Sequence, residues 1–265
     1  FHAVDKRVMG HAFGIHNTLG RFLVEPIYQE SLAGQCRLDG MTAQREVQLR
    51  VSHNGFVKSY YLDLLIQQGV IYELKTVESL TGDHERQLIN YLLLTNLKHG
   101  KLINFHSGSV ESRYVSTSLT REERMSFRLA DDKWDGDDAA SRELREKFQA
   151  LLVDWGAFLE ASLYREALLH LISLPDAGVT PVEISMDGRV LGNQKMCLLS
   201  PDTAWHISAI RRHYTKYEKH IRRLLSNTPL HRIHWLNLDH KTITLNTLKK
   251  NDSAIHNSAI ELKGG

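Results

Sequence analysis

The sequence is poor in cysteine: its 265 residues include only Cys36 and Cys197. These two lie far apart and lack the short spacing of metal-binding cysteines, so the sequence supports neither a disulfide framework nor a cysteine-based zinc site. A chain with so few cysteines fits a reducing compartment, and we expect a cytoplasmic protein.

Long apolar runs and targeting signals are also missing. No apolar run approaches the roughly 20 residues of a membrane-spanning helix, so we expect no membrane partner. The start at Phe1 lacks the basic, apolar and small-residue pattern of a secretion signal, and we expect it to reflect trimming. Hydrophobic residues make up 42% and charged residues 24%, an ordinary globular composition, and the net charge of +2 identifies no partner.

The first hundred residues alternate between helical and strand patterns. Apolar residues recur at helical spacing up to Leu19, Gly20 can end that helix, and Pro26 allows a second helix to open near Glu25. Asn54-Gly55 is a strong hairpin-turn signal between two strand-like runs. The patterns predict, in order, a helix over 4–19, a helix from Glu25, strands over 47–51, 60–66 and 70–77 with a turn at Gln67-Gln68-Gly69, a helix after Gly82 and a strand over 101–105.

Polar and acidic residues dominate the segment that follows, where aspartates cluster around Gly136. The twelfth position counted from Asp131 is Arg142, although a calcium-binding loop requires a glutamate there, so the cluster does not predict calcium binding. The composition predicts a first domain over 1–118, an acidic linker over 119–143, a second domain over 144–250 and a C-terminal tail over 251–265.

The second half of the chain repeats the first in outline. Residues 20–32 match residues 156–168 in their Gly, Phe, Leu, Tyr and Glu positions, Asn54-Gly55 matches Asp187-Gly188, and 102–105 matches 232–235. Two unrelated α/β segments are the alternative to a duplication. The register of a duplication would put Met196 opposite Asp63, His206 opposite Glu73 and Ser208 opposite Lys75. The second copy would then be degenerate and non-catalytic.

Two carboxylates and a lysine stand out in the first half. Residues two apart on a strand point the same way, so Glu73 and Lys75 project together, and Asp63 lies on the adjoining strand. Carboxylate oxygens suit Mg²⁺ or Mn²⁺, which can polarise a phosphodiester and activate water, while Lys75 can orient that water. The alternative is a pair of neighbouring polar residues on a solvated strand. The apolar surroundings favour the functional interpretation, because a buried carboxylate needs a partner or a metal.

The ordered set Asp63, Glu73-Leu-Lys75 resembles the PD-(D/E)XK nuclease superfamily. The motif Gln87-Leu-Ile-Asn-Tyr91 resembles the Q-x-x-x-Y element of its RecB and lambda-exonuclease-like branch. Together with Gly20 and Glu25-Pro-Ile-Tyr28, these motifs resemble the bacterial GxxExxY protein family over residues 4–105. Phe22 stands where that family has a glycine, which puts the local turn in doubt more than the metal centre.

The resemblance implies an α/β protein with a restriction-endonuclease-like core, a mixed central sheet flanked by helices, that cleaves nucleic acid with a divalent metal. It also makes Glu25 a further metal ligand or its support; the alternative is a carboxylate favoured by the helix dipole. Gln87, Tyr91 and His84 share a helix face and would place the substrate. The alternative for this element is a tyrosine in the core with a local hydrogen bond to Gln87.

Positive charge gathers in the second half, where Arg211, Arg212 and Lys216 begin a basic, tyrosine-containing segment that suits a nucleic-acid backbone. A solvated amphipathic helix is the alternative. The sequence thus predicts a metal-dependent nuclease, DNA favoured over RNA, with a non-catalytic second domain for substrate or a partner. The rival hypothesis is a catalytically silent scaffold in a defence or repair complex; a homodimer or protein partner fits either.

Overall fold

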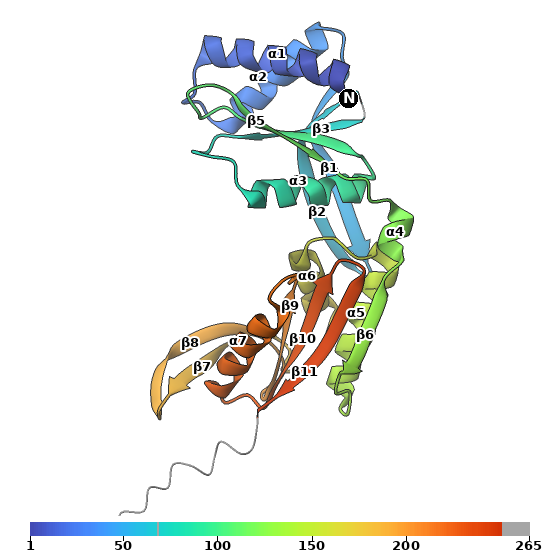
Figure 1. Ribbon diagram of the computed structural model, residues 1–265, viewed down its shortest axis with the longest axis vertical. Coiled ribbons are helices and arrows are strands. Elements are labelled where there is room, and N and C mark those ends of the chain that lie inside the picture. The colour runs from blue at the N-terminus through green and yellow to red at the C-terminus, as the bar shows by residue number, and fades with distance from the viewer. Residues whose placement is uncertain (68, 251–265) are drawn as a thin grey trace, which may run out of the picture. The chain divides into compact units, whose positions relative to one another are not determined.

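The computed structural model describes residues 1–67 and 69–250 (Figure 1). Gln68, part of the predicted turn, and the predicted tail over 251–265 lie outside the described residues. The chain divides into two compact units, Phe1–Arg124 and Met125–Gly265. Within the described residues, no helix has the length and apolarity to cross a bilayer.

The first unit is a mixed sheet between helices. Its strands run in the order β1-β2-β3-β4-β5, with β3 and β4 parallel and the other neighbours antiparallel. Together with the mixed sheet of the second unit, this confirms the predicted α/β class and is consistent with a restriction-endonuclease-like fold. The elements are α1 (His2–Leu19), α2 (Glu25–Leu38), β1 (Ala43–His53), β2 (Phe56–Ile66), β3 (Val70–Lys75), α3 (Gly82–Thr95), β4 (His99–Asn104) and β5 (Glu111–Ser116), and α4 (Arg121–Met125) follows at the unit boundary.

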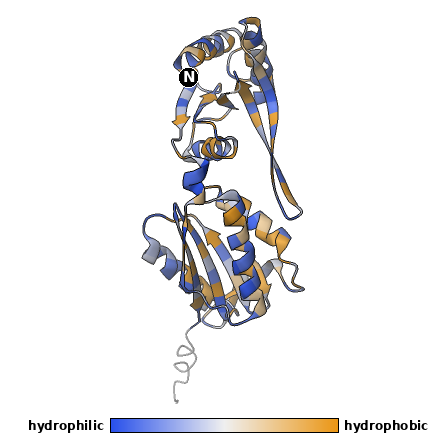
Figure 2. Cartoon of the chain, turned by 90° about the vertical axis from the view of Figure 1, so that its right-hand side faces the viewer, coloured by the Kyte–Doolittle hydropathy of each residue, from blue (hydrophilic) through white to orange (hydrophobic). Residues whose placement is uncertain are grey.

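Hydrophobic cores form on both faces of this sheet. Helices α1 and α2 cover one face and α3 covers the other (Figure 1). Tyr72 and Leu74 of β3 pack towards α1 and α2, whereas Ile71 packs towards Leu88 and Leu92 of α3. Hydrophilic and hydrophobic residues accordingly alternate along the helices and strands (Figure 2). The alternation places Glu73 and Lys75 on the same face of β3 as Ile71.

The junction of α1 and α2 is fixed by a tyrosine. Gly20 ends α1 with φ 72°, a conformation that favours glycine. The Tyr28 hydroxyl donates to the Gly20 carbonyl at 2.7 Å and accepts the Leu23 amide hydrogen at 3.2 Å. Tyr28 is fully buried and stacks on Phe105 at 4.4 Å. This contact sets where α2 starts, and Glu25 is its first residue.

The second unit has a six-stranded mixed sheet in the order β6-β11-β10-β9-β8-β7. Helix α7 lies on one face and helices α5 and α6 lie on the other (Figure 1). The elements are β6 (Arg128–Lys133), α5 (Ala139–Trp155), α6 (Ala161–Leu171), β7 (Gly178–Met186), β8 (Arg189–Ser200), β9 (Thr203–Ser208), α7 (Tyr214–Ser226), β10 (Arg232–Asp239) and β11 (Thr242–Lys249).

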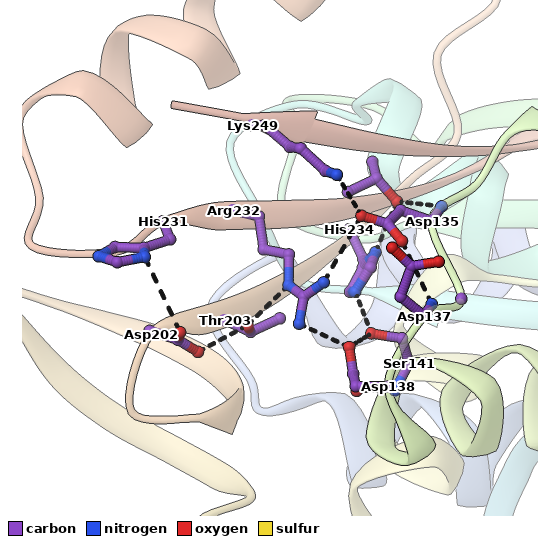
Figure 3. A network of polar contacts seen from close by, with 12 residues as sticks. Asp135, Asp137, Asp138, Ser141, Asp202, Thr203, His231, Arg232, His234 and Lys249 are labelled. Carbon is purple, nitrogen blue, oxygen red and sulfur yellow. Dashed lines mark hydrogen bonds and ion pairs between the residues drawn. The ribbon is translucent and has the colours of Figure 1, made fainter. Parts of the chain in front are cut away.

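The segment predicted as an acidic linker contains α4 and strand β6, and β6 pairs in parallel with β11. Its aspartates bind cations of the second unit (Figure 3). Asp135 contacts Lys249 at 2.5 Å, Asp138 contacts Arg232 at 2.5 Å, and the Asp138 side chain also caps α5 by accepting the Ser141 amide hydrogen. These carboxylates therefore neutralise basic residues of the sheet instead of forming a calcium loop.

The two units share one element order and one strand register. From α1 and from α5 onwards, both run helix, helix, three strands, helix, two strands. In the first unit Leu64 pairs with Tyr72 and Lys75 with Asn104; in the second, Cys197 pairs with Trp205 and Ser208 with Asn237. Every one of these positions is shifted by 133 residues.

This shift corrects one detail of the predicted repeat. The match of 102–105 with 232–235 is wrong by three residues. Glu73 pairs with Leu102 in the first unit, and His206 pairs with Trp235 in the second, so Trp235 corresponds to Leu102 and not to Phe105. That match rested on residue type, since Phe105 and Trp235 are both fully buried aromatic residues, although Phe105 directly follows β4 and Trp235 lies inside β10.

Equivalent side chains make equivalent hydrogen bonds. The Asn104 side chain accepts the Val77 amide hydrogen at 3.2 Å and donates to the Val77 carbonyl at 2.7 Å. Asn237 does the same with Ile210, at 2.7 and 3.0 Å. The tyrosine contact also recurs, because the Tyr164 hydroxyl donates to the Gly156 carbonyl. The loop after the third strand is thus held in the same way in both units.

Replacing either asparagine by alanine should destabilise its own unit. Asn104 and Asn237 are 0% and 1% exposed, so Asn104→Ala and Asn237→Ala each leave a backbone amide and carbonyl without their partner. We expect each to cost about 1–3 kcal/mol in urea unfolding. Asn193→Ala, at an exposed strand position, is the matched control. A loss no larger than that of the control would contradict the structural role of the two asparagines.

Candidate active site

Asp63 lies where β2 changes face. The β1–β2 ladder passes from the pair Arg45–Leu64 to the pair Val47–Leu62, and between them Glu46 has φ 49°. On one side of this irregularity Leu64 packs towards α1 and α2; on the other, Leu62 packs towards α3. A local bend of this kind re-aims a side chain.

The bend turns Asp63 towards β3. Pairing between β2 and β3 covers residues 64–66 and 70–72, and beyond it Asp63 Oδ2 accepts the Leu74 amide hydrogen at 2.7 Å. The Asp63 side chain therefore occupies a place in the ladder that a backbone carbonyl would otherwise take, next to Glu73.

Glu73 and Lys75 form an ion pair on the adjoining strand. Lys75 Nζ lies 2.8 Å from Glu73 Oε1, and the two side chains are 13% and 2% exposed. The second oxygen, Glu73 Oε2, is buried and has no hydrogen-bond partner among the described residues. A buried carboxylate oxygen without a partner is costly, so this atom marks a place for a cation.

Glu25 is a third carboxyl group that interacts electrostatically with Asp63, Glu73 and Lys75. Burial raises the pKa of Glu25, while the charges of Lys75 and His84 lower it. In turn Glu25 raises the pKa values of both Asp63 and Glu73. The Gln29 side-chain amide donates to Glu25 Oε1 at 3.3 Å. The predicted residues Glu25, Asp63, Glu73 and Lys75 come from three separate elements and lie near enough to shift one another's pKa values.

Carboxyl groups outnumber ammonium groups in this cluster, so ionising all of them would leave an excess of negative charge. Burial and the neighbouring Glu73 raise the pKa of Asp63 from 3.8 to about 8, and burial also raises the pKa of Glu73. Burial lowers the pKa of Lys75, but Glu73 and the other carboxyls raise it overall, so the lysine stays charged. Three carboxyl groups share one ammonium, and a divalent cation would supply the missing positive charge.

The donor atoms of this cluster are of the type that binds a divalent metal, but they do not form a complete coordination sphere. Within the part of the chain that the structure describes, no three or more His, Cys, Asp or Glu side chains are gathered closely enough to hold an ion. Asp63 Oδ2 is bound to the Leu74 amide and Glu73 Oε1 to Lys75. By the same criterion Glu25 Oε1 is bound to Gln29, and the remaining oxygens that could face a cation are Glu73 Oε2, Asp63 Oδ1 and Glu25 Oε2.

The predicted substrate-placing residues on α3 differ in their surroundings. His84 forms a capping box with Thr81 and accepts the Thr81 amide hydrogen at 3.0 Å. Gln87 donates to the Tyr91 hydroxyl at 2.9 Å, and Tyr91 is 5% exposed, with its ring edge-to-face against Tyr60. Tyr91 thus adopts the core arrangement that the sequence left as an alternative, and His84 and Gln87 remain nearer the surface.

The predicted basic residues lie in the second unit, at the start of α7. Arg211, Arg212 and Lys216 are exposed. The inner side of α7 buries Ile221 and Leu225, as an amphipathic helix does. The segment therefore has the amphipathic character of the alternative interpretation, and nucleic-acid contact by its exposed cations stays a prediction.

Two features of the site were absent from the predictions. One is the left-handed conformation of Glu46 opposite Asp63, which no turn residue announces. The other is Asn104, which holds the chain just after Lys75 and also donates to Glu111 at 3.1 Å. An asparagine ending a buried strand, repeated as Asn237, was the available signal for the second feature.

The pKa shift of Asp63 predicts how stability depends on pH. Folding takes up a proton at the Asp63–Glu73 pair between about pH 4 and pH 8, since the Asp63 pKa rises from 3.8 to about 8. The folded state binds more protons than the unfolded state in this window, so stability is lost as the pH rises through it.

With chelator present, Asp63→Asn should therefore raise the melting temperature by at least about 3 °C at pH 8 and by less at pH 5. Asparagine keeps an oxygen for the Leu74 amide and removes the charge. Glu78→Gln, at an exposed carboxylate of the same unit, is the control. The same change at both pH values would contradict a buried, proton-binding Asp63.

Comparison with known proteins locates a family match in this unit. The model of the family described as the PD-(D/E)XK nuclease superfamily matches residues 2–115. No curated protein matches the chain. Among solved structures, the crystal structure of SSO0001 is 22% identical with a TM-score of 0.29, over 35% of this chain and 50% of that chain. The first unit, which holds Asp63, Glu73 and Lys75, is thus the part of the chain similar to PD-(D/E)XK nucleases.

Proposed function

We propose that the first unit is a metal-dependent nuclease that hydrolyses phosphodiester bonds of nucleic acid, with DNA the favoured substrate. The observation that carries this proposal is Glu73, a nearly fully buried carboxylate next to Asp63 and Lys75 within the matched residues. One of its oxygens has no hydrogen-bond partner in the part of the chain that the structure describes. The Glu25-x-x-Tyr28 spacing and Gln87-x-x-x-Tyr91 further support membership of the GxxExxY family in the RecB-like branch.

Asp63, Glu73 and Glu25 would hold Mg²⁺ or Mn²⁺ through oxygens, the ligands these ions prefer. When bound, the ion would polarise the phosphate and lower the pKa of its water. Lys75 has the other central role. Its raised pKa keeps it protonated, so its ammonium can position the attacking water and offset the negative charge that develops on the phosphate oxygens.

Substrate contact is proposed for residues around this centre and in the second unit. His84 and Gln87 lie on α3, and the charge of His84 lowers the pKa of Glu25. Tyr91 would act by holding Gln87 in place through their 2.9 Å hydrogen bond. The exposed cations Arg211, Arg212 and Lys216 would bind the phosphate backbone. Binding of this kind is favourable because the cations displace counterions condensed on the nucleic acid.

We further propose that the second unit is a degenerate duplicate of the first. The common strand register and the repeated Asn104 and Asn237 hydrogen bonds support this descent. At the equivalent positions the second unit has Met196, His206 and Ser208 where the first has Asp63, Glu73 and Lys75. It would therefore bind substrate or a partner without cutting.

Cleavage assays test the nuclease proposal directly. Labelled single- and double-stranded DNA and RNA would be incubated with Mg²⁺, with Mn²⁺ and with chelator. We expect metal-dependent cutting that Lys75→Ala and Glu73→Gln reduce by about 100-fold or more. Lys98→Ala, at an exposed lysine of the same unit, should cut like the wild type. Cutting that survives in Lys75→Ala or in chelator would remove the assignment.

A silent scaffold is the second candidate, favoured by the absence of a finished ligand set in the described residues and by the lysine that occupies Glu73 Oε1. In that case no substrate would be cut with either metal, while nucleic-acid binding or a stable protein complex would persist.

The basic start of α7 predicts salt-dependent binding. Replacing Arg211, Arg212 and Lys216 together by alanine should weaken binding of uncleaved DNA and reduce the slope of log affinity against log salt by about 1 per removed charge. The charge-matched control replaces Arg128, Lys133 and Lys241, which are exposed on other elements of the same unit. Equal slopes for the two triple variants would exclude a specific role for this segment.

A further inference from the structure

The second unit has a cavity at the position of the first unit's catalytic centre. It measures about 420 Å³ and lies between β8, β9, α6 and α7. Met196 and His206 line it, and the strand register places them where Asp63 and Glu73 stand in the first unit. Cavities of roughly 300–1,000 Å³ are the usual size for small-molecule sites in proteins.

The charge of this cavity is opposite to that of the first site. Arg165, Lys195 and His220 lie at exposed positions of its lining, and no aspartate or glutamate lines it among residues 1–67 and 69–250. Among the described residues, neither Arg165 nor Lys195 forms an ion pair within 4.0 Å. Two cations without carboxylate partners can bind a phosphate directly, so this site needs no metal to attract an anion.

The inner part of the cavity is apolar and aromatic. Met196, Ile221 and Leu224 line it, together with the rings of Tyr217 and His206, which lie 5.9 Å apart and nearly parallel. His206 Nε2 is hydrogen-bonded to the Tyr217 hydroxyl at 2.7 Å. Burial and the nearby Arg165 lower the pKa of His206, so the ring is neutral at pH 7 and its face suits a base.

We propose that this cavity binds one nucleotide without metal, with the base against Tyr217, His206 and Met196 and the phosphate at Arg165 and Lys195. The inference rests on the proposed role of the second unit in nucleic-acid binding, and it is independent of cleavage by the first. Helix α7 links the two features, because it contributes Tyr217 and His220 to the cavity and carries Lys216 and Lys219 at exposed positions. A nucleic-acid strand bound along α7 would place one of its nucleotides in the cavity.

The chain carries its own reporter for this site. Cys197 lines the cavity and is partly exposed, while Cys36, the other cysteine, is fully buried. Ligand in the cavity should slow alkylation of Cys197 by iodoacetamide, with Cys36 unreactive in the folded chain. The Lys75→Ala chain in EDTA would be used throughout, so that cleavage of the oligonucleotide by the first unit cannot be mistaken for loss of binding.

Three probes separate the ligand chemistries: thymidine monophosphate, a short 5′-phosphorylated oligothymidylate and inorganic phosphate. We expect the nucleotide or the oligonucleotide to slow alkylation at least about fivefold at saturation, and inorganic phosphate at equal concentration to have little effect. Protection by the oligonucleotide alone identifies a strand as the source; protection by both admits the free nucleotide. Equal protection by inorganic phosphate, or none by any probe, would overturn the proposal.

Variants test the phosphate contacts. Arg165→Glu with Lys195→Glu should weaken the affinity of the protecting probe at least about tenfold. Both residues are exposed, so the fold should tolerate the changes. The control pair Lys133→Glu and Lys241→Glu makes the same charge change away from the cavity. An equal loss in both pairs would reduce the effect to general electrostatics and overturn the assigned contacts.

Discussion

The first unit is organised around the burial of one carboxylate. Glu73 is in the centre of a sheet whose neighbouring residues are apolar, and a charge there must have compensation. Lys75 compensates one oxygen, and the other has no partner in the described residues. The bend of β2 at Asp63, the start of α2 at Glu25 and the Asn104 contact beyond Lys75 all bring polar groups to this point. The fold thus gathers carboxyl groups around a single lysine, where a further cation would favour their ionised forms.

The second unit has the same framework without this constraint. It shares the strand register, the asparagine contact and the tyrosine contact, and Met196 and His206 stand at the register positions of the two carboxylates. The ladder through Thr180 and Met196 is also regular there, without a residue like Glu46 in the left-handed region. The bend therefore accompanies the buried aspartate and is not required by the topology. A cavity lined by cations occupies the same place.

Much of the fold was predictable, because helix and strand periodicities and the Asn54-Gly55 and Asp187-Gly188 turns are local signals. The pairing of Asp63 with the Glu73 strand followed from the tight reversal between them. The bend at Glu46 could not be predicted, since it accompanies a non-local contact, the hydrogen bond from the Leu74 backbone amide to the Asp63 side chain on the neighbouring strand. The patterns also do not predict strand β5, because only Val115 of its inward-facing residues is apolar, the other two being Glu111 and Arg113. Tyr91 showed the limit of motifs: its spacing indicated a site, whereas its burial was set by α3 packing on Leu62 and Ile71.

The tyrosine contact separates architecture from chemistry within one short motif. Gly20 and Tyr28 close the junction between two helices, and Gly156 and Tyr164 close the corresponding junction in the unit that lacks the carboxylates. The glycine and the tyrosine therefore serve the geometry of the junction in both units, and only the intervening glutamate distinguishes the unit with the proposed metal site. In the second unit that position, counted from Gly156, is Ala161, the first residue of α6. A sequence with the glycine and the tyrosine of this motif can therefore form the helix junction whichever residue lies between them.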